Sequence, residues 1–222
     1  MTAQVSAFRW VPPFAQGFVR DLRVRWALEE AGLPYEAVLL DFQTKNSPAY
    51  RAWQPFAQVP AYRDGEVEMF ESGAIVLHIA AKSEALAPRD PAGAARVTSW
   101  TIAALNSIEP FAQNFAQLDG FFAGQPWVEG YRPVAEGVIV ERLTALAATL
   151  GEKSHLLGRF TAADLVMTTV LRELVESGML ARFPALDAYR ARCEARPAFG
   201  RALEAQLSTF RDNAPEPSAA AE

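Results

Sequence analysis

The stretch VPAYRDGEVEMFESGAI, residues 59–75, decides the fold of this chain. An Asp64-Gly65 pair between two short strand-like runs is a strong signal for a β-hairpin, because both residues adopt tight-turn conformations easily. The returning strand, 67–70, leads into apolar residues at helical spacing that begin just after Ser72. The stretch therefore predicts an antiparallel hairpin with a helix directly behind it.

The residues upstream alternate strand and helix signals. Strands are predicted over 4–10 and 35–42, and a helix between them runs from Phe18 to a cap at Gly32. Residues 43–58 predict a loop and a short helix. A strand-helix-strand unit favours a parallel pair of strands, and the hairpin adds an antiparallel edge. The first part of the chain is therefore predicted to be an α/β domain.

Residues 83–91 contain prolines and are typical of an interdomain linker. Downstream of this stretch, sequence signals for strands almost vanish. Helical periodicity appears in five segments, 92–109, 133–150, 162–176, 184–195 and 198–210. The predicted fold class is thus α/β plus all-α, with one domain over 1–82 and a helical bundle over 92–212. The Pro/Ala/Glu/Ser tail, 213–222, is expected to be frayed.

The composition excludes several classes of function. The 222 residues carry a net charge of −5, whereas nucleic-acid-binding surfaces are normally basic. No apolar run approaches the roughly 18 residues that cross a bilayer, and the start lacks the layout of a signal peptide. The single cysteine, Cys193, is interpreted as inert. A Cys/His zinc site needs three or four ligands, and Cys193 and the two histidines are spread over more than a hundred residues of the sequence, so such a site is not expected. We expect a cytoplasmic protein without metal, nucleic-acid or membrane partners.

Four segments stand in the order and spacing of one family. QPFAQVP, residues 54–60, is similar to that family's Asn-Pro-x-Gly-x-Val-Pro, and FESGAI, residues 70–75, is similar to its Glu-Ser-x-Ala-Ile. Residues 22–36 resemble its first helix, and 160–165 resemble a buried capping segment in its second domain. The chain thus resembles the glutathione transferase superfamily, as a cytosolic, bacterial-type member. The resemblance implies a thioredoxin-like domain followed by a helical bundle, glutathione as co-substrate without a metal, and a two-fold homodimer.

The resemblance also implies which residues bind glutathione. The family's proline at position 60 is cis, which would turn the backbone of Val59 outward to pair with an extended ligand peptide, and Gln58 belongs to the same motif. Ser72, at a helix start, would receive the γ-glutamyl carboxylate, with Glu71 near the amino group. The alternatives are an ordinary loop proline at position 60 and a helix-capping role for the serine.

The residue that activates the thiol in familiar classes is missing. Those classes carry a Tyr, Ser or Cys near the start of the first helix, where this chain has Phe18 and Val19. Arg20 aligns with an Asn that contacts the sulfur in some bacterial members similar to this one, and Gln16 would serve if its loop folds inward. Lowering a thiol pKa by two units needs ~2.7 kcal/mol. A guanidinium ~4 Å away supplies up to ~4 kcal/mol at an effective dielectric constant of ~20. The alternative for Arg20 is a solvated charge paired with an acidic neighbour.

The resemblance leads to two hypotheses about function. The first is an enzyme that conjugates the glutathione thiolate to a small hydrophobic electrophile or reduces an organic peroxide. The second is a non-catalytic binding or scaffold protein of the same fold. Lys45 and Gln43 follow the second strand, where family members hold the glycine carboxylate, although a solvated loop charge is equally compatible with the sequence. The apolar wall for the electrophile is predicted from Phe111, Phe115, Phe121, Phe122 and Trp127. Thr161 and Asp164 are assigned to helix capping.

Overall fold

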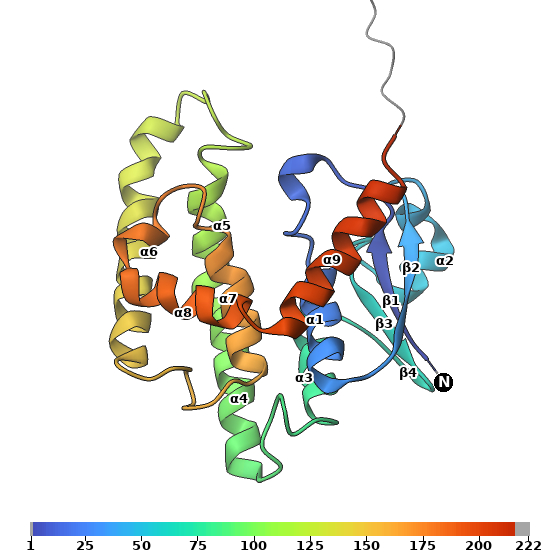
Figure 1. Ribbon diagram of the computed structural model, residues 1–222. Coiled ribbons are helices and arrows are strands. Elements are labelled where there is room, and N and C mark those ends of the chain that lie inside the picture. Colours follow the sequence, from blue (N-terminus) through green and yellow to red (C-terminus); the bar gives the residue numbers. More distant parts are fainter. Residues whose placement is uncertain (1, 216–222) are drawn as a thin grey trace, which may run out of the picture. The chain divides into compact units, whose positions relative to one another are not determined.

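The computed structural model describes residues 2–215, and contacts within it divide the chain into two units (Figure 1). The first unit runs to Ile75 and takes in the chain from Ala198 on, whereas the second is the continuous stretch Val76–Pro197. This grouping differs from the predicted division at 83–91, because the last helix joins the first unit. The predicted frayed tail lies largely outside the described residues.

A four-stranded sheet forms the centre of the first unit. Its strands are β1 (Ala3–Phe8), β2 (Tyr35–Leu40), β3 (Ala61–Asp64) and β4 (Val67–Phe70). The order across the sheet is β2-β1-β3-β4, with β1 parallel to β2 and antiparallel to β3. Strands β3 and β4 form the predicted hairpin, and Gly65 in its turn has a φ of 62°, which glycine adopts without steric cost. The predicted parallel pair with an antiparallel hairpin at its edge, and the thioredoxin-like arrangement, are confirmed.

Three helices follow strands in the first unit, namely α1 (Asp21–Ala31), α2 (Pro48–Trp53) and α3 (Ser72–Ala80), which continues into the second unit. The prediction that the first helix begins at Phe18 is wrong by three residues. The chain from residue 9 to Arg20 is a loop that contains a 3₁₀ turn at Pro13–Ala15. Helix α1 ends as predicted at Gly32, whose left-handed φ of 66° closes the last turn.

Helix α9 (Pro197–Asp212) packs on α1 (Figure 1). The fully buried Trp26 of α1 meets Phe199 of α9 edge to face, with ring centroids 4.8 Å apart. The side-chain amide of Gln206 donates to Asp21 Oδ1 at 2.6 Å and to the carbonyl of Val19 at 3.1 Å. Helix α9 therefore covers α1 and holds the backbone at its start.

The second unit is helical throughout, and its helices are α4 (Pro91–Ala103), α5 (Glu109–Gln117), α6 (Val128–Leu150), α7 (Ala162–Arg172) and α8 (Pro184–Glu194). Helix α5 was not predicted as a separate element. It follows a π-helical turn at Ala104–Ile108, and Pro110 stands in its first turn, a position that proline tolerates. Helix α6 begins five residues before the predicted 133 and includes Pro133.

Within residues 2–215, no helix combines the length and apolarity that crossing a bilayer requires. In the same range, no three histidine, cysteine, aspartate or glutamate side chains gather in a way that would hold a metal ion.

Candidate functional site

The β3–β4 hairpin brings the two binding motifs of the sequence together. Ala61, the first residue of β3, is paired with Phe70, the last residue of β4. Pro60 and Glu71 directly flank this pair, so both motifs lie at the same end of the hairpin. The Val59–Pro60 peptide bond is cis, and Glu71 has a positive φ of 69°. Non-glycine residues in this conformation are uncommon and concentrate at functional sites.

A chain of buried hydroxyl groups fixes the backbone around the cis bond. Tyr50 donates its hydroxyl proton to the carbonyl of Gln58 at 2.6 Å, and burial raises the pKa of Tyr50, so the hydroxyl stays protonated. Ser6 Oγ lies 2.7 Å from the Tyr50 hydroxyl and accepts the N–H of Ala61 at 2.6 Å. Since Tyr50 has one proton, Ser6 donates to it. Residues on both sides of Val59 are therefore anchored to β1 and α2.

The side chain of Gln54 stabilises the loop that precedes Val59. Gln54 occupies the position where the family motif has Asn. Its side-chain oxygen accepts the N–H groups of Phe56 at 2.7 Å and Gln58 at 3.2 Å. Lys45 Nζ donates to the carbonyl of Ala57 at 3.3 Å. The structure thus brings Lys45 to the loop that carries Gln58 and Val59.

The backbone of Val59 itself is left available. Neither its N–H nor its C=O has a hydrogen-bond partner within residues 2–215, although its neighbours on both sides are bonded. Buried or half-buried backbone groups are nearly always paired in folded proteins. A free N–H and C=O on one residue is the arrangement to which an extended peptide adds as an extra strand.

Ser72 does not cap helix α3 in the way that the alternative interpretation proposed. The carbonyl that accepts the first helical N–H, from Ile75, belongs to Glu71, and Ser72 is the first residue of the helix. Its Oγ instead accepts a hydrogen bond from Nη1 of Arg23 in α1, at 3.3 Å. Both side chains are buried, with Arg23 2% and Ser72 5% exposed. Sequence analysis missed Arg23, because a contact across 49 residues leaves no local pattern.

The start of α1 lies next to the Val59 segment. Val19 packs against a cluster of buried side chains that includes Tyr50 and Val59. Arg20, the residue that precedes α1, is half-buried. The acidic neighbours have other partners as well, since Asp21 pairs with Arg25 at 2.7 Å and Glu29 with Arg201 at 2.7 Å. Because Val19 contacts this cluster, Arg20, the next residue, lies near the Val59 segment.

Gln16 folds back onto its own loop, where its side-chain amide donates to the carbonyl of Val11 at 3.0 Å. This hydrogen bond holds the loop in shape and occupies one of the two amide protons that thiol activation would use. Of the two candidate catalytic residues, Arg20 is the one next to the packed start of α1.

The predicted apolar wall divides into two kinds of side chain. Phe115 is buried in the second unit, and Phe111 is half-buried with the Arg142 guanidinium 5.0 Å from its ring centroid. The exposed members are Phe121, at 71% exposure, Phe122 and Trp127. Phe122 and Trp127 contact each other with centroids 5.1 Å apart. Phe121, Phe122 and Trp127 are therefore the members of the predicted wall that reach the surface of the second unit.

Two other predicted assignments concern residues outside the site. Thr161 and Asp164 form a complete capping box at the start of α7, as expected from their spacing. Cys193 is buried, and burial raises the pKa of its thiol to about 11. A buried neutral thiol is a poor nucleophile, which agrees with the interpretation of Cys193 as inert.

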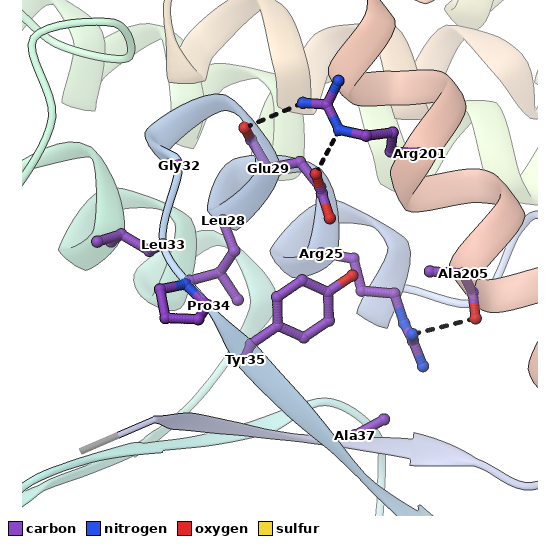
Figure 2. Close-up of a pocket in the computed structure, with 10 residues that line it drawn as sticks. All are labelled: Arg25, Leu28, Glu29, Gly32, Leu33, Pro34, Tyr35, Ala37, Arg201 and Ala205. Carbon is purple, nitrogen blue, oxygen red and sulfur yellow. Dashed lines mark hydrogen bonds and ion pairs between the residues drawn. The ribbon is translucent and has the colours of Figure 1, made fainter.

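A pocket of about 660 Å³ lies elsewhere in the first unit, between the end of α1, the start of β2 and α9 (Figure 2). Figure 2 shows that its polar groups already bind one another, with Arg201 on Glu29 and Arg25 on the carbonyl of Ala205. None of the predicted site residues lines it. These contacts join α9 to α1, and the pocket is separate from the candidate site.

The comparisons with known proteins all find members of the same family. The family model described as "Glutathione S-transferase, N-terminal domain" matches residues 15–81. Glutathione S-transferase 3 of Zea mays is 30% identical over 203 residues, covering 83% of this chain and 88% of the relative. Glutathione S-transferase F10 of Arabidopsis thaliana is 31% identical over 166 residues, covering 68% and 75%.

Solved structures agree with these relatives. A glutathione transferase from Burkholderia graminis, with two glutathione molecules bound per subunit, superposes with a TM-score of 0.80 at 25% identity, covering 91% of this chain and 88% of that one. Fold, motifs and relatives of comparable length therefore lead to one assignment: the chain belongs to the glutathione S-transferase family.

Proposed function

We propose that this chain binds glutathione between Val59 and Ser72 and conjugates its thiolate to a small hydrophobic electrophile. The observation that carries the proposal is that the N–H and C=O of Val59, beside the start of α3, have no hydrogen-bond partner within residues 2–215. The cysteinyl backbone of glutathione would pair with Val59, and the γ-glutamyl carboxylate would meet Ser72, with Glu71 near the amino group. Gln58, and Lys45 through the loop that it bonds, would meet the glycine end.

The chemistry requires the sulfur as a thiolate. The thiol proton leaves to solvent, the sulfur lone pair forms a bond to the electrophilic carbon, and the leaving group departs with its electron pair. Catalysis would come from holding the thiolate in one orientation and stabilising its charge. We assign that stabilisation to Arg20, which precedes α1, together with the N–H groups of the first turn of α1. Peroxide reduction, a homodimer and a cytoplasmic location remain predictions.

Replacing Ser72 with alanine tests the binding site. We expect the affinity for glutathione to fall at least about tenfold in calorimetric titration, because a hydrogen bond to a charged group is lost. Ser208→Ala is the matched control, since the Ser208 hydroxyl donates to the carbonyl of Ala205 on α9, away from the candidate site. Wild-type protein that gives no binding heat with glutathione would contradict the proposal.

Replacing Arg20 with alanine tests the activation of the thiol. We expect kcat to fall about 10- to 100-fold at neutral pH, because the pKa of the bound thiol returns toward its free value near 8.5. The pH profile of the remaining activity should move upward, and the ultraviolet absorbance of the bound thiolate should appear only at higher pH. Unchanged turnover of chlorodinitrobenzene would remove Arg20 from the mechanism.

The same measurements separate the enzyme from the non-catalytic scaffold. A protein that binds glutathione through Ser72 but turns over no member of a broad panel of electrophiles fits the scaffold. Turnover that Ser72→Ala lowers in proportion to the loss of binding fits the enzyme. The missing hydroxyl or thiol at Phe18 and Val19 is the feature that favours the scaffold.

A further inference from the structure

The pocket of Figure 2 is lined by a guanidinium whose hydrogen bonds are incomplete. Arg25 borders this pocket of about 660 Å³ and is only 3% exposed. Its Nε donates to Asp21 and its Nη1 donates to the carbonyl of Ala205, but Nη2 has no hydrogen-bond partner within residues 2–215. A buried N–H group without an acceptor costs free energy. A ligand that brings an acceptor into the pocket would supply the missing partner.

Tyr35 adds a second donor next to Arg25. It lines the same pocket, and Cζ of Arg25 lies 6.0 Å from the centroid of its ring. Burial raises the pKa of Tyr35, and although Arg25 opposes that rise, the hydroxyl keeps its proton at neutral pH. A guanidinium can only donate, so Arg25 leaves this proton available to another acceptor. The two oxygens of a carboxylate can accept from both neighbouring groups.

Glu29 supplies an acceptor in the same pocket. Its Oε2 accepts from Nε of Arg201 at 2.7 Å, whereas no hydrogen bond reaches Oε1 within residues 2–215. Because Arg25 pairs with Asp21 and Arg201 pairs with Glu29, the four charges at the pocket cancel. A ligand that carries one positive and one negative group therefore matches the pocket better than a simple anion or cation.

The other walls of the pocket are apolar. They are formed by Leu28, Leu33, Pro34, Ala37 and Ala205. A concave site of this size, with apolar walls and a few polar groups, is typical of sites that bind small molecules. An apolar side chain on the ligand would gain free energy in proportion to the surface that it buries against these walls.

We propose that this pocket binds a free α-amino acid with a large apolar side chain. Its carboxylate would accept from the Tyr35 hydroxyl and the Arg25 guanidinium, and its ammonium group would donate to Glu29 Oε1. Its side chain would pack against Leu28 and Pro34. This site is separate from the proposed glutathione site, and the inference does not rest on the proposed function.

The test uses L-phenylalanine and two analogues that each lack one charged group. 3-Phenylpropionate lacks the ammonium group, whereas 2-phenylethylamine lacks the carboxylate. Dissociation constants are measured by ligand-detected NMR titration, with and without glutathione. We expect L-phenylalanine to bind with a dissociation constant below about 1 mM, and at least about tenfold more tightly than either analogue. Glutathione should leave these values unchanged, because the two sites are separate.

Two variants assign the charged groups of the ligand to their partners. Tyr35→Phe should weaken the binding of L-phenylalanine and 3-phenylpropionate about three- to tenfold and leave 2-phenylethylamine unchanged, because the lost donor serves the carboxylate. Glu29→Gln should weaken L-phenylalanine and 2-phenylethylamine without weakening 3-phenylpropionate. Tyr131→Phe is the matched control, because the Tyr131 hydroxyl lies in the second unit, where it accepts from Asn114. All three affinities should be unchanged in that variant.

Glu29→Gln also covers the case in which Tyr35→Phe fails to fold, since the ion pair between Glu29 and Arg201 is partly exposed. Three results would each overturn the inference: no binding of L-phenylalanine at about 10 mM, an analogue that binds as tightly as L-phenylalanine, or variants that weaken all three ligands alike. A loss of L-phenylalanine binding when glutathione is added would place the ligand in the glutathione site and would overturn the inference as well.

Discussion

Replacing Asp164 with alanine should lower the free energy of unfolding by about 4 kcal/mol or more, which is a large share of the stability of most domains. The carboxylate is fully buried and accepts four hydrogen bonds. Oδ1 accepts the N–H of Leu156 at 2.8 Å and the hydroxyl of Tyr189 at 2.9 Å. Oδ2 accepts the N–H and the hydroxyl of Thr161 at 2.9 and 3.0 Å. Alanine would leave these donors buried without an acceptor.

Urea unfolding followed by circular dichroism measures this loss. Thr161→Ala should cost only about 1 kcal/mol, as is usual for a lost helix cap, and Asp164→Asn should fall between the two. Asp187→Ala is the matched control, because Asp187 is an exposed partner of Arg190 whose ion pair is worth at most about 1 kcal/mol. A loss of stability in Asp164→Ala no greater than that in the control would show that the capping box is dispensable.

Replacing Arg25 with methionine should destabilise the protein by about 3–5 kcal/mol at neutral pH, because it leaves the buried Asp21 carboxylate without its counter-charge. Arg25 Nε donates to Asp21 Oδ2 at 2.7 Å, and both side chains are almost completely buried. Burial raises the pKa of Asp21 above its ordinary value, while Arg25 and the amide of Gln206 oppose that rise. Removing Arg25 therefore raises the pKa of Asp21 further.

The sign of the pH dependence follows from that rise. A carboxyl group whose pKa is higher in the folded than in the unfolded state stabilises the fold below its unfolded pKa, near 3.8. This contribution is lost as the pH rises through the folded pKa. The penalty of Arg25→Met should consequently be smallest near pH ~4 and grow toward pH ~8.

Urea unfolding of the wild type and Arg25→Met at several pH values measures how the loss of unfolding free energy changes with pH. The double variant Asp21→Asn with Arg25→Met removes both charges and should show a smaller penalty that does not vary with pH. If the loss of unfolding free energy in Arg25→Met is the same at every pH, the Asp21 carboxylate is not left charged and buried in that variant.

Local signals in the sequence predict much of the site. The Asp64-Gly65 turn fixes the hairpin, and the hairpin register brings Pro60 and Glu71 together without further assumptions. Gly32 marks the end of α1, because a left-handed residue is needed there. Thr161 and Asp164 show their capping role through spacing alone. In each of these cases the interacting residues are only a few positions apart in the sequence, or the register of a single β-turn determines which more distant residues are paired.

The rest depends on contacts between distant residues. Arg23 meets Ser72 across 49 positions, and Gln206 meets Asp21 across 185, so no periodicity reveals either pair. Ser6 and Tyr50, which anchor the segment around Val59, read in the sequence as ordinary strand and helix residues. The same limit explains why the predicted domain boundary assigned 198–210 to the helical bundle, although these residues group with the first unit.

The placement of α9 has a consequence for how the protein is made. The first unit needs residues from Ala198 on, whereas the second is one uninterrupted stretch of chain. During synthesis, which proceeds at about 5–20 residues per second, the second unit is complete on the ribosome before the first. Until the last helix emerges, the nascent chain carries Trp26 without its Phe199 partner and Asp21 without Gln206. The half of the molecule that is translated earliest is therefore the last to acquire its native packing.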